Sequence, residues 1–242
     1  MKKLKVLLLI LGAFLLVTLA YVYYDQSQKT KMPTDEELIK ELSIDETRDG
    51  VKHIQDKVKI DDNRLFVPYI STKGDYSISL WEWDRGKWEL RSWGQKGEVR
   101  IWKGKLSKPS SYYLVWNMSP KDNIGQIKVS LGKERVFYVS DQEMRYNPEI
   151  DLSTEINVEN KTYGYQTISE EWVQFLTHYY QAETAINFDS LFNHVFANQF
   201  IVYTWIAKDA KGNIILPENS VFGNGSGGGE SVDYIIYQSP DE

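Results

Sequence analysis

Cysteine is absent from this sequence of 242 residues, and histidine occurs only three times. The absence of cysteine excludes a disulfide framework, a thiolate metal site, a cysteine nucleophile and the lipid-modified cysteine of a lipoprotein. His53, His178 and His194 lie far apart in the sequence and form no HExxH pattern, so they give no local support for a metal site. We therefore expect neither a metal nor another cofactor, and we expect the hydrophobic core alone to stabilise the fold.

Recognisable catalytic motifs are also lacking. The glycine-rich stretch 223–229 is not followed by the Lys-Ser/Thr pair of a phosphate-binding loop, and Asn224 stands where a nucleophile elbow requires glycine, so Ser226 is a poor nucleophile candidate. We interpret this stretch as a flexible surface loop. The acidic turns 61–63 and 209–213 lack the spacing of a calcium loop. The sequence favours a non-enzymatic role and leaves enzymatic activity open.

Aromatic residues are abundant, at 14% of the chain with eight tryptophans and sixteen tyrosines. Because aromatic side chains are enriched in strands, this composition predicts a β-dominated fold. The formal net charge is −6, and residues 1–24 contain three of the 28 basic residues and no acid, so the remainder carries 25 basic and 34 acidic groups, or −9. This balance argues against nucleic acid or an anionic lipid surface as a partner of the main domain.

An uncharged apolar segment runs from Val6 to Tyr24. As a helix it would rise about 28 Å, which is close to the hydrocarbon thickness of a bilayer. The lysines before it favour a cytoplasmic N-terminus, and Tyr21, Tyr23 and Tyr24 suit the opposite interface. We expect residues 1–24 to be a single-pass anchor in the cell membrane, with the C-terminal domain extracellular.

A cleavable signal peptide is the competing interpretation of the same segment. Val6 to Val17 has the length and apolar composition of the hydrophobic region of a signal peptide. Thr18-Leu19-Ala20 places small residues where a signal peptidase would cut. Cleavage after Ala20 would release a secreted protein. The uncleaved anchor is favoured because the apolar stretch continues beyond the cut and is longer than a usual signal region.

The remainder of the chain divides by pattern. Residues 25–33 are polar and end at Pro33, which predicts a short linker. A capping box that begins at Thr34 starts a helix, and residues 34–140 are expected to be this helix followed by antiparallel strands. Residues 141–160 are expected to be an irregular connection. Residues 161–242 are expected to be a C-terminal α+β part, either packed on the same core or folded as a second lobe.

Alternating apolar and polar residues after Gly50 predict short strands in an antiparallel meander or sandwich, and therefore an α+β, β-dominated fold class with two or three peripheral helices. One helix is expected after a capping box of Thr167 and Glu170, and a short one around 191–196. Pro68 cannot donate to a ladder, so its strand should lie at an edge or carry a bulge. The expected strands are 51–60, 64–70, 76–83, 88–93, 98–103, 112–117, 126–131, 135–140, 161–167, 200–207, 213–216 and 232–237.

A hairpin is predicted at residues 81–90, where a glycine-containing turn separates two aromatic runs. A two-residue loop at Arg85 and Gly86 would pair Trp83 with Trp88 on one face of the sheet. A three-residue loop with Gly86 in a left-handed bulge would instead place the two tryptophans on opposite faces. The bulged register is favoured.

Four tryptophans are the candidate ligand-binding residues. In the bulged register Trp81, Trp83, Trp93 and Trp102 would project from one sheet face beside Ser, Glu and Arg side chains, which is typical of a platform for a sugar chain or a partner protein. The opposing interpretation is that a second layer, such as the helix around Trp172, covers that face and makes the tryptophans core residues.

These features favour a membrane-anchored extracytoplasmic protein with a non-enzymatic binding or assembly domain of the cell envelope. The alternative is a carbohydrate-active enzyme or a polysaccharide-binding module of the cell wall. An enzyme of this kind would need a cleft with two carboxylates about 5 to 10 Å apart. An envelope protein or a wall polysaccharide is therefore the expected partner, besides the membrane itself.

Three segments of the first third of the chain carry a resemblance. They are a capped helix after the anchor (Glu37–Leu42), a strand pair (Ile60–Tyr69) and a Trp-x-x-Gly-Lys-Trp hairpin (Trp83–Trp88). Together they resemble a loose group of uncharacterised membrane-anchored or secreted proteins of Gram-positive bacilli. The resemblance implies a wall-facing address and brings no activity or functional residue with it.

Overall fold

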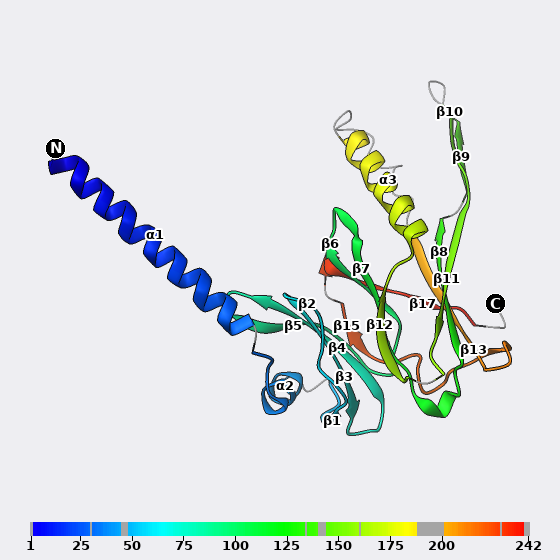
Figure 1. The fold of residues 1–242 in the computed structure, drawn as a ribbon. Helices are drawn as coiled ribbons and strands as arrows, with labels where there is room; N and C mark the ends of the chain where they lie inside the picture. Colours follow the sequence, from blue (N-terminus) through cyan, green and yellow to red (C-terminus); the bar gives the residue numbers. More distant parts are fainter. Residues whose placement is uncertain are drawn as a thin grey trace.

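The structure is a computed structural model that describes residues 2–29, 31–44, 48–133, 135–139, 144–159, 161–187, 201–227 and 229–239. Antiparallel strands predominate in these residues, and an apolar helix stands at the N-terminus, so the expected β-dominated α+β class is confirmed. Figure 1 shows helix α1 (Lys2–Lys29) extending away from a body of stacked sheets.

Helix α1 contains the apolar segment. Residues Lys5–Tyr24 are long and apolar enough to cross a membrane, judged by length and composition, and none of this window is buried against the rest of the protein. The helix continues to Lys29, so the first residues of the segment 25–33, which we expected to be a linker, are helical.

Helix α2 (Asp35–Leu42) begins as the sequence predicts. The Thr34 hydroxyl accepts a hydrogen bond from the backbone N–H of Glu37 at 3.3 Å, and the Glu37 carboxylate accepts one from the N–H of Thr34 at 2.8 Å. This capping box satisfies two backbone donors at the helix start. Leu38 and Leu42 are buried on the face that α2 turns to the first sheet.

The first sheet has the strand order β1-β3-β4-β5-β15, with β2 also paired to β3. Its strands are β1 (Val51–Ile54), β2 (Val58–Asp61), β3 (Arg64–Ser71), β4 (Tyr76–Asp84), β5 (Lys87–Gly94) and β15 (Gly225–Ser226). The single strand expected over 51–60 is broken opposite Pro68, whose carbonyl accepts from Gln55 N at 2.9 Å. Because Pro68 has no N–H to donate on that side, it interrupts the neighbouring strand, while the pairing of β3 with β4 stays regular.

The second sheet has the order β12-β7-β6-β16, and the third has the order β11-β8-β13-β14 with β17 also paired to β13. Only the β13–β17 pair is parallel among the described strands. The second sheet contains β6 (Arg100–Lys105), β7 (Lys108–Asn117), β12 (Tyr163–Thr167) and β16 (Val232–Tyr234). The third contains β8 (Gln126–Lys133), β11 (Ile150–Asn157), β13 (Val202–Lys208), β14 (Ile214–Ile215) and β17 (Ile236–Tyr237). Strands β9 (Val136–Val139) and β10 (Met144–Asn147) form a separate pair, and short 3-10 turns lie at Pro120–Asp122 and Gly229–Ser231.

Three buried clusters hold the layers together. One lies between α2 and the outer face of the first sheet, and a second, which includes Phe66 and Trp102, lies between the first and second sheets. The third and largest joins the second sheet, the third sheet and helix α3 (Glu170–Asn187) through Trp172. This cluster contains residues from Val99 to Ile235, so the described part of residues 161–242 shares a core with the preceding strands.

The C-terminal half corrects two expectations. Residues 141–160, expected to be irregular, contain β10 and β11. In β11, Ile150, Leu152 and Ile156 alternate with polar residues that are more exposed, which is the period of a strand. The cap of α3 is Ser169 and not Thr167: the Ser169 hydroxyl accepts from the N–H of Trp172 at 3.3 Å, while Thr167 is still in β12. The short helix expected around 191–196 lies outside the described residues.

Candidate ligand-binding site

Three of the four candidate tryptophans are core residues. Trp81, Trp93 and Trp102 are 2%, 5% and 0% exposed. Trp81 and Trp93 lie under helix α2, and Trp102 lies between the first and second sheets. The exposed platform expected over residues 81, 83, 93 and 102 is therefore absent. Trp81 and Trp93 are covered by α2 and Trp102 by the first sheet, and none of the three by the helix around Trp172.

The β4–β5 hairpin explains why the favoured register is wrong. Its turn has two residues, Arg85 and Gly86, both with positive φ (48° and 88°), and Trp83 lies directly opposite Trp88. A turn of this kind matches the right-handed twist of the flanking strands. The register shift occurs farther along, between Leu80 and Trp81, where β5 has an additional residue.

Trp83 is the one candidate tryptophan that stays partly accessible. Its ring packs edge-on against Trp88, with centroids 5.6 Å apart, and both side chains are half-buried. The Trp88 indole donates to the carbonyl of Lys31 at 3.1 Å, two residues after α1 ends. The end of the hairpin that bears Trp83 is therefore hydrogen-bonded to the segment that directly follows α1.

A cavity of about 470 Å³ opens beside Trp83. Its walls come from the β2–β3 turn, the start of β3, the end of β4 and the hairpin formed by β6 and β7. These segments meet because the first sheet stacks on the second. Tyr113 of β7 provides a second aromatic wall.

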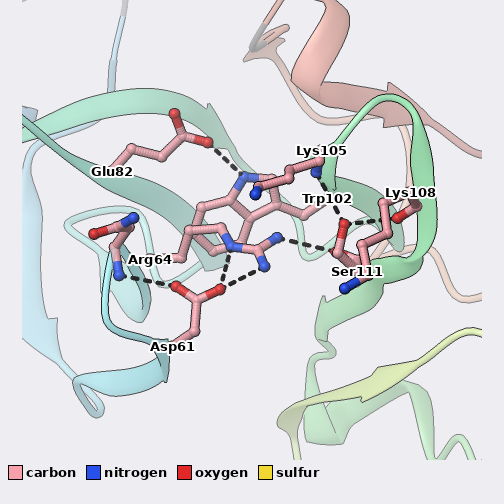
Figure 2. Close-up of polar contacts among 8 residues, drawn as sticks. Asp61, Arg64, Glu82, Trp102, Lys105, Lys108 and Ser111 are labelled. Carbon is pink, nitrogen blue, oxygen red and sulfur yellow. Dashed lines mark hydrogen bonds and ion pairs between the residues drawn. The ribbon is translucent and has the colours of Figure 1, made fainter.

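Arg64 is the most buried residue of the cavity lining and forms its floor. Figure 2 shows the polar contacts of its guanidinium. Its Nε and one terminal nitrogen donate to Asp61 Oδ2 at 2.8 and 2.5 Å, and the other terminal nitrogen donates to the Ser111 carbonyl at 3.1 Å. The guanidinium lies 4.8 Å from the ring centroid of Tyr113 and 5.6 Å from that of Trp102. Since Arg64 is only 7% exposed, these contacts replace the water that the charge loses on burial.

Gly104 allows the arginine to occupy this position. A Cβ atom at residue 104 would lie 2.5 to 2.7 Å from three guanidinium atoms of Arg64. Such a distance is well inside van der Waals contact, so any larger residue would displace the guanidinium. Gly104 and Arg64 are thus matched across the two sheets.

The two cavity carboxylates are already engaged. Figure 2 shows that Asp61 binds Arg64 and that Glu82 accepts from the Trp102 indole, at 3.2 Å. Glu82 also pairs with Arg91 at 3.3 Å. Both carboxylates accept hydrogen bonds from donors fixed by the fold. Each of the two carboxylates thus already has a cationic partner in the fold.

Two lysines stand at the rim on either side of the β6–β7 turn. Ser111 organises this turn, because its hydroxyl accepts from the N–H of Lys105 at 2.9 Å and donates to the carbonyl of Lys108 at 2.7 Å. The Lys105 and Lys108 side chains are exposed and line the cavity. Within the described part of the chain neither ammonium group has an acidic partner.

The other features singled out in the sequence lie outside this cavity. The stretch 223–229 is not a free loop in its described part: β15 pairs with β5, and the Ser226 carbonyl accepts from the Ser92 hydroxyl at 2.7 Å. His53 and His178 are exposed, and His194 lies outside the described residues. No group of three or more potential metal ligands occurs among the residues described.

The sequence pointed to Trp83 and missed most of its neighbours. The Asp61-x-x-Arg64 spacing across a turn was the available signal for the ion pair, but Gly104, Lys105 and Lys108 join the site only through the stacking of two sheets. Comparisons of the chain with protein-family models, with curated proteins and with solved structures found no match.

Proposed function

We propose that this chain is a membrane-anchored extracytoplasmic binding module of the cell envelope, and that its ligand occupies the cavity beside Trp83. The observation that carries this proposal is the cavity of about 470 Å³ with a fixed arginine floor. Its size is within the range of small-molecule sites, and it combines two aromatic walls with a few convergent polar groups. A side chain as costly to bury as Arg64 is well suited to preorganise such a site.

A binding role is favoured over catalysis by the state of the two carboxylates. Asp61 and Glu82 share the cavity with an aromatic wall, which is the arrangement that motivates a carbohydrate-active enzyme as the second candidate. In this site, however, Arg64, Arg91 and the Trp102 indole occupy them as hydrogen-bond or ion-pair partners. If Glu82→Gln abolished release of reducing ends from wall polysaccharide while leaving binding intact, the enzyme would replace the binding module.

The tryptophans provide a direct test of the site. The full chain, labelled with ¹⁵N-tryptophan and inserted into lipid nanodiscs, is titrated with two soluble probes, the neutral sugar chitotetraose and glycerol 1-phosphate. We expect the indole signal of Trp83, assigned from the Trp83→Phe variant, to shift with at least one probe. Trp81 and Trp93 serve as internal controls because they are buried under α2, and their signals should stay in place. Trp102 is not a control, because its indole donates to the cavity carboxylate Glu82.

Two results would count against the cavity as a ligand site. One is the absence of any Trp83 shift with either probe. The other is a uniform change in all indole signals, which would indicate a global effect on the fold and not binding beside one residue.

The extracytoplasmic address can be tested separately because the chain has no cysteine. Ser107 lies exposed in the β6–β7 turn, so a Ser107→Cys variant should react with a membrane-impermeant maleimide in intact cells. A Lys2→Cys variant, before the apolar segment, should react only after lysis. Equal protection of Ser107→Cys and Lys2→Cys in intact cells would contradict the proposed topology.

Retention of α1 is part of the same proposal and has its own measurement. The mass of the protein purified from membranes should correspond to the full chain. A mature species that begins after Ala20, found in the medium, would support the secreted form instead.

A further inference from the structure

The uncompensated charge of the cavity is positive, although the chain as a whole carries a net charge of −6. Among the lining residues, the three positive charges of Arg64, Lys105 and Lys108 exceed the two negative charges of Asp61 and Glu82 by one. Asp61 pairs with Arg64, and Glu82 pairs with Arg91, which Asp84 and Glu89 share. Lys105 and Lys108 have no such partner in the described residues. An entering anion would therefore meet two ammonium groups within a site whose acids are already paired.

The rim also holds neutral hydrogen-bonding groups with unused capacity. The side-chain amide of Asn63 and the hydroxyl of Ser110 line the cavity, and neither side chain has a hydrogen-bond partner in the part of the chain that the structure describes. An amide and a hydroxyl can donate to an anion or exchange hydrogen bonds with ligand hydroxyl groups. Trp83 and Tyr113 add surfaces for a carbon skeleton.

The position of the cavity relates it to the membrane-spanning segment. Trp83 contacts Trp88, and Trp88 is hydrogen-bonded to the carbonyl of Lys31, just after α1. Figure 1 shows the β4–β5 hairpin beside the end of α1. In a chain anchored by α1, the cavity would open close to the bilayer surface.

From these observations we infer that the cavity binds a phosphate-bearing polyol of the glycerophosphate type. Lys105 and Lys108 hold the phosphate, Asn63 and Ser110 contact the hydroxyl groups, and Trp83 and Tyr113 contact the carbon skeleton. This inference rests on the proposed function and names the ligand class for the same site. The phosphate belongs either to a lipid headgroup of the adjacent bilayer or to a soluble or wall-borne polymer.

Glycerol 1-phosphate is the soluble probe for the ligand class. The full chain is placed in nanodiscs of zwitterionic phosphatidylcholine, and the dissociation constant is measured by calorimetry at low ionic strength. The double variant Lys105→Gln/Lys108→Gln should bind at least about tenfold more weakly, because charge-assisted hydrogen bonds to the phosphate are lost. Added salt should weaken binding by the wild type more than binding by the variant.

The matched control removes the same charge elsewhere. Lys121 and Lys211 are exposed, lie outside the cavity and have no ion-pair partner among the described residues. Lys121→Gln/Lys211→Gln should therefore bind glycerol 1-phosphate with the wild-type dissociation constant. Equal weakening in both double variants would overturn the inference, since it would reduce the effect to net charge.

The lipid and the polymer sources are distinguished by changing the nanodisc. If the lipid headgroup is the source, nanodiscs with phosphatidylglycerol should shift the Trp83 indole signal without any soluble probe, and the lysine double variant should lose this shift. If Trp83 stays unshifted there and glycerol 1-phosphate still shifts it, the source is a soluble or wall-borne polymer. Both results support the phosphate site.

Failure of the inference can be told from failure of the proposed function. If chitotetraose shifts Trp83 and glycerol 1-phosphate does not bind, the cavity is a ligand site for neutral sugars and the phosphate assignment is overturned. If neither probe acts on Trp83, in phosphatidylcholine or in phosphatidylglycerol nanodiscs, both proposals fail.

Discussion

Arg64 and Arg100 are two buried arginines at the same sheet interface, and the fold uses them differently. Arg64 is 7% exposed and Arg100 is fully buried. Each forms an ion pair with a nearby acid, Asp61 or Glu98, and each lies over at least one aromatic ring. The two sites are therefore alike in composition.

The difference lies in what surrounds each guanidinium. Arg100 donates to Ser92 Oγ, Trp93 O and Ser226 O at 2.7, 3.0 and 3.1 Å, so it ties β6 to β5 and β15. The Nε atom of Arg100 is buried without an acceptor, and Arg100 does not line the cavity. Arg64 has acceptors for all three nitrogens and borders the cavity. A buried arginine can thus fasten strands together or form a preorganised floor for a ligand, depending on the space beside it.

The largest effect is expected from Arg100→Met. The substitution removes the hydrogen bonds that Arg100 donates to Ser92 Oγ, Trp93 O and Ser226 O, of which Ser226 O keeps the Ser92 hydroxyl as a donor. It also leaves Glu98 without its partner, so the free energy of unfolding should fall by about 3 to 5 kcal/mol. Denaturant unfolding of the full chain measures this quantity. The control Arg135→Met removes an exposed arginine and should change it by less than about 0.5 kcal/mol. A comparable loss in both variants would contradict the fastening role.

Arg64→Met should lower the free energy of unfolding less than Arg100→Met does, and it should weaken ligand binding. Asp61 is 39% exposed, so water can take the place of the lost guanidinium, and we expect a loss of about 1 to 3 kcal/mol. The Trp83 indole response to glycerol 1-phosphate or chitotetraose should be weakened at the same time, because the cavity floor is removed. A loss of unfolding free energy equal to that of Arg100→Met would show that both arginines hold the strands together to the same extent.

Two glycine substitutions compare the space around the arginines without deleting them. A Cβ at Gly94 would lie 2.5 Å from a terminal nitrogen of Arg100, and a Cβ at Gly104 equally near to one of Arg64. Arg64 can yield toward the cavity and Arg100 cannot, so Gly94→Ala should destabilise by about 1 kcal/mol more than Gly104→Ala. Gly104→Ala should instead alter the Trp83 response. Equal unfolding free energies would contradict this difference in free space.

The contrast between the fold and the site also marks what the sequence could predict. Alternation of apolar residues located most strands, and the cap of α2 was predicted correctly because Thr34 and Glu37 act within one turn. The register of the 81–90 hairpin was missed because Arg85 adopts the left-handed conformation that the prediction assigned to Gly86 alone. The burial of Trp81 and Trp93 depends on where α2 lies, and local pattern carries no information on that position.

The candidate site was less predictable than the fold for a similar reason. Trp83 was selected for its residue type. Arg64 and Gly104, in contrast, lie forty residues apart in sequence and are matched across two sheets. No periodicity within either strand reveals such a pair. Side-chain pattern therefore located most of the strands and left the stacking of the sheets undetermined.

The smallest effect is expected at Glu98, the acid that faces Arg100. Burial raises the pKa of Glu98 above its ordinary value of 4.5, and the charge of Arg100 offsets this only in part. Between 4.5 and the raised pKa the folded protein binds more protons than the unfolded chain, so this group's contribution to stability falls as the pH rises through that window. Glu155 has the opposite sign, because a hydrogen bond from Lys208 lowers its pKa, and stability linked to it is lost as the pH falls.

Glu98→Gln separates the two opposing dependences. The difference in unfolding free energy between the wild type and Glu98→Gln should decrease as the pH is raised from about 4 through the window above 4.5, and then become constant. Contributions from Glu155 and other acids cancel in this difference. Denaturant unfolding of both proteins across the pH range measures it. A difference independent of pH would mean that Arg100 compensates the burial of Glu98 completely, and that the Arg100 site is as fully satisfied as the Arg64 site.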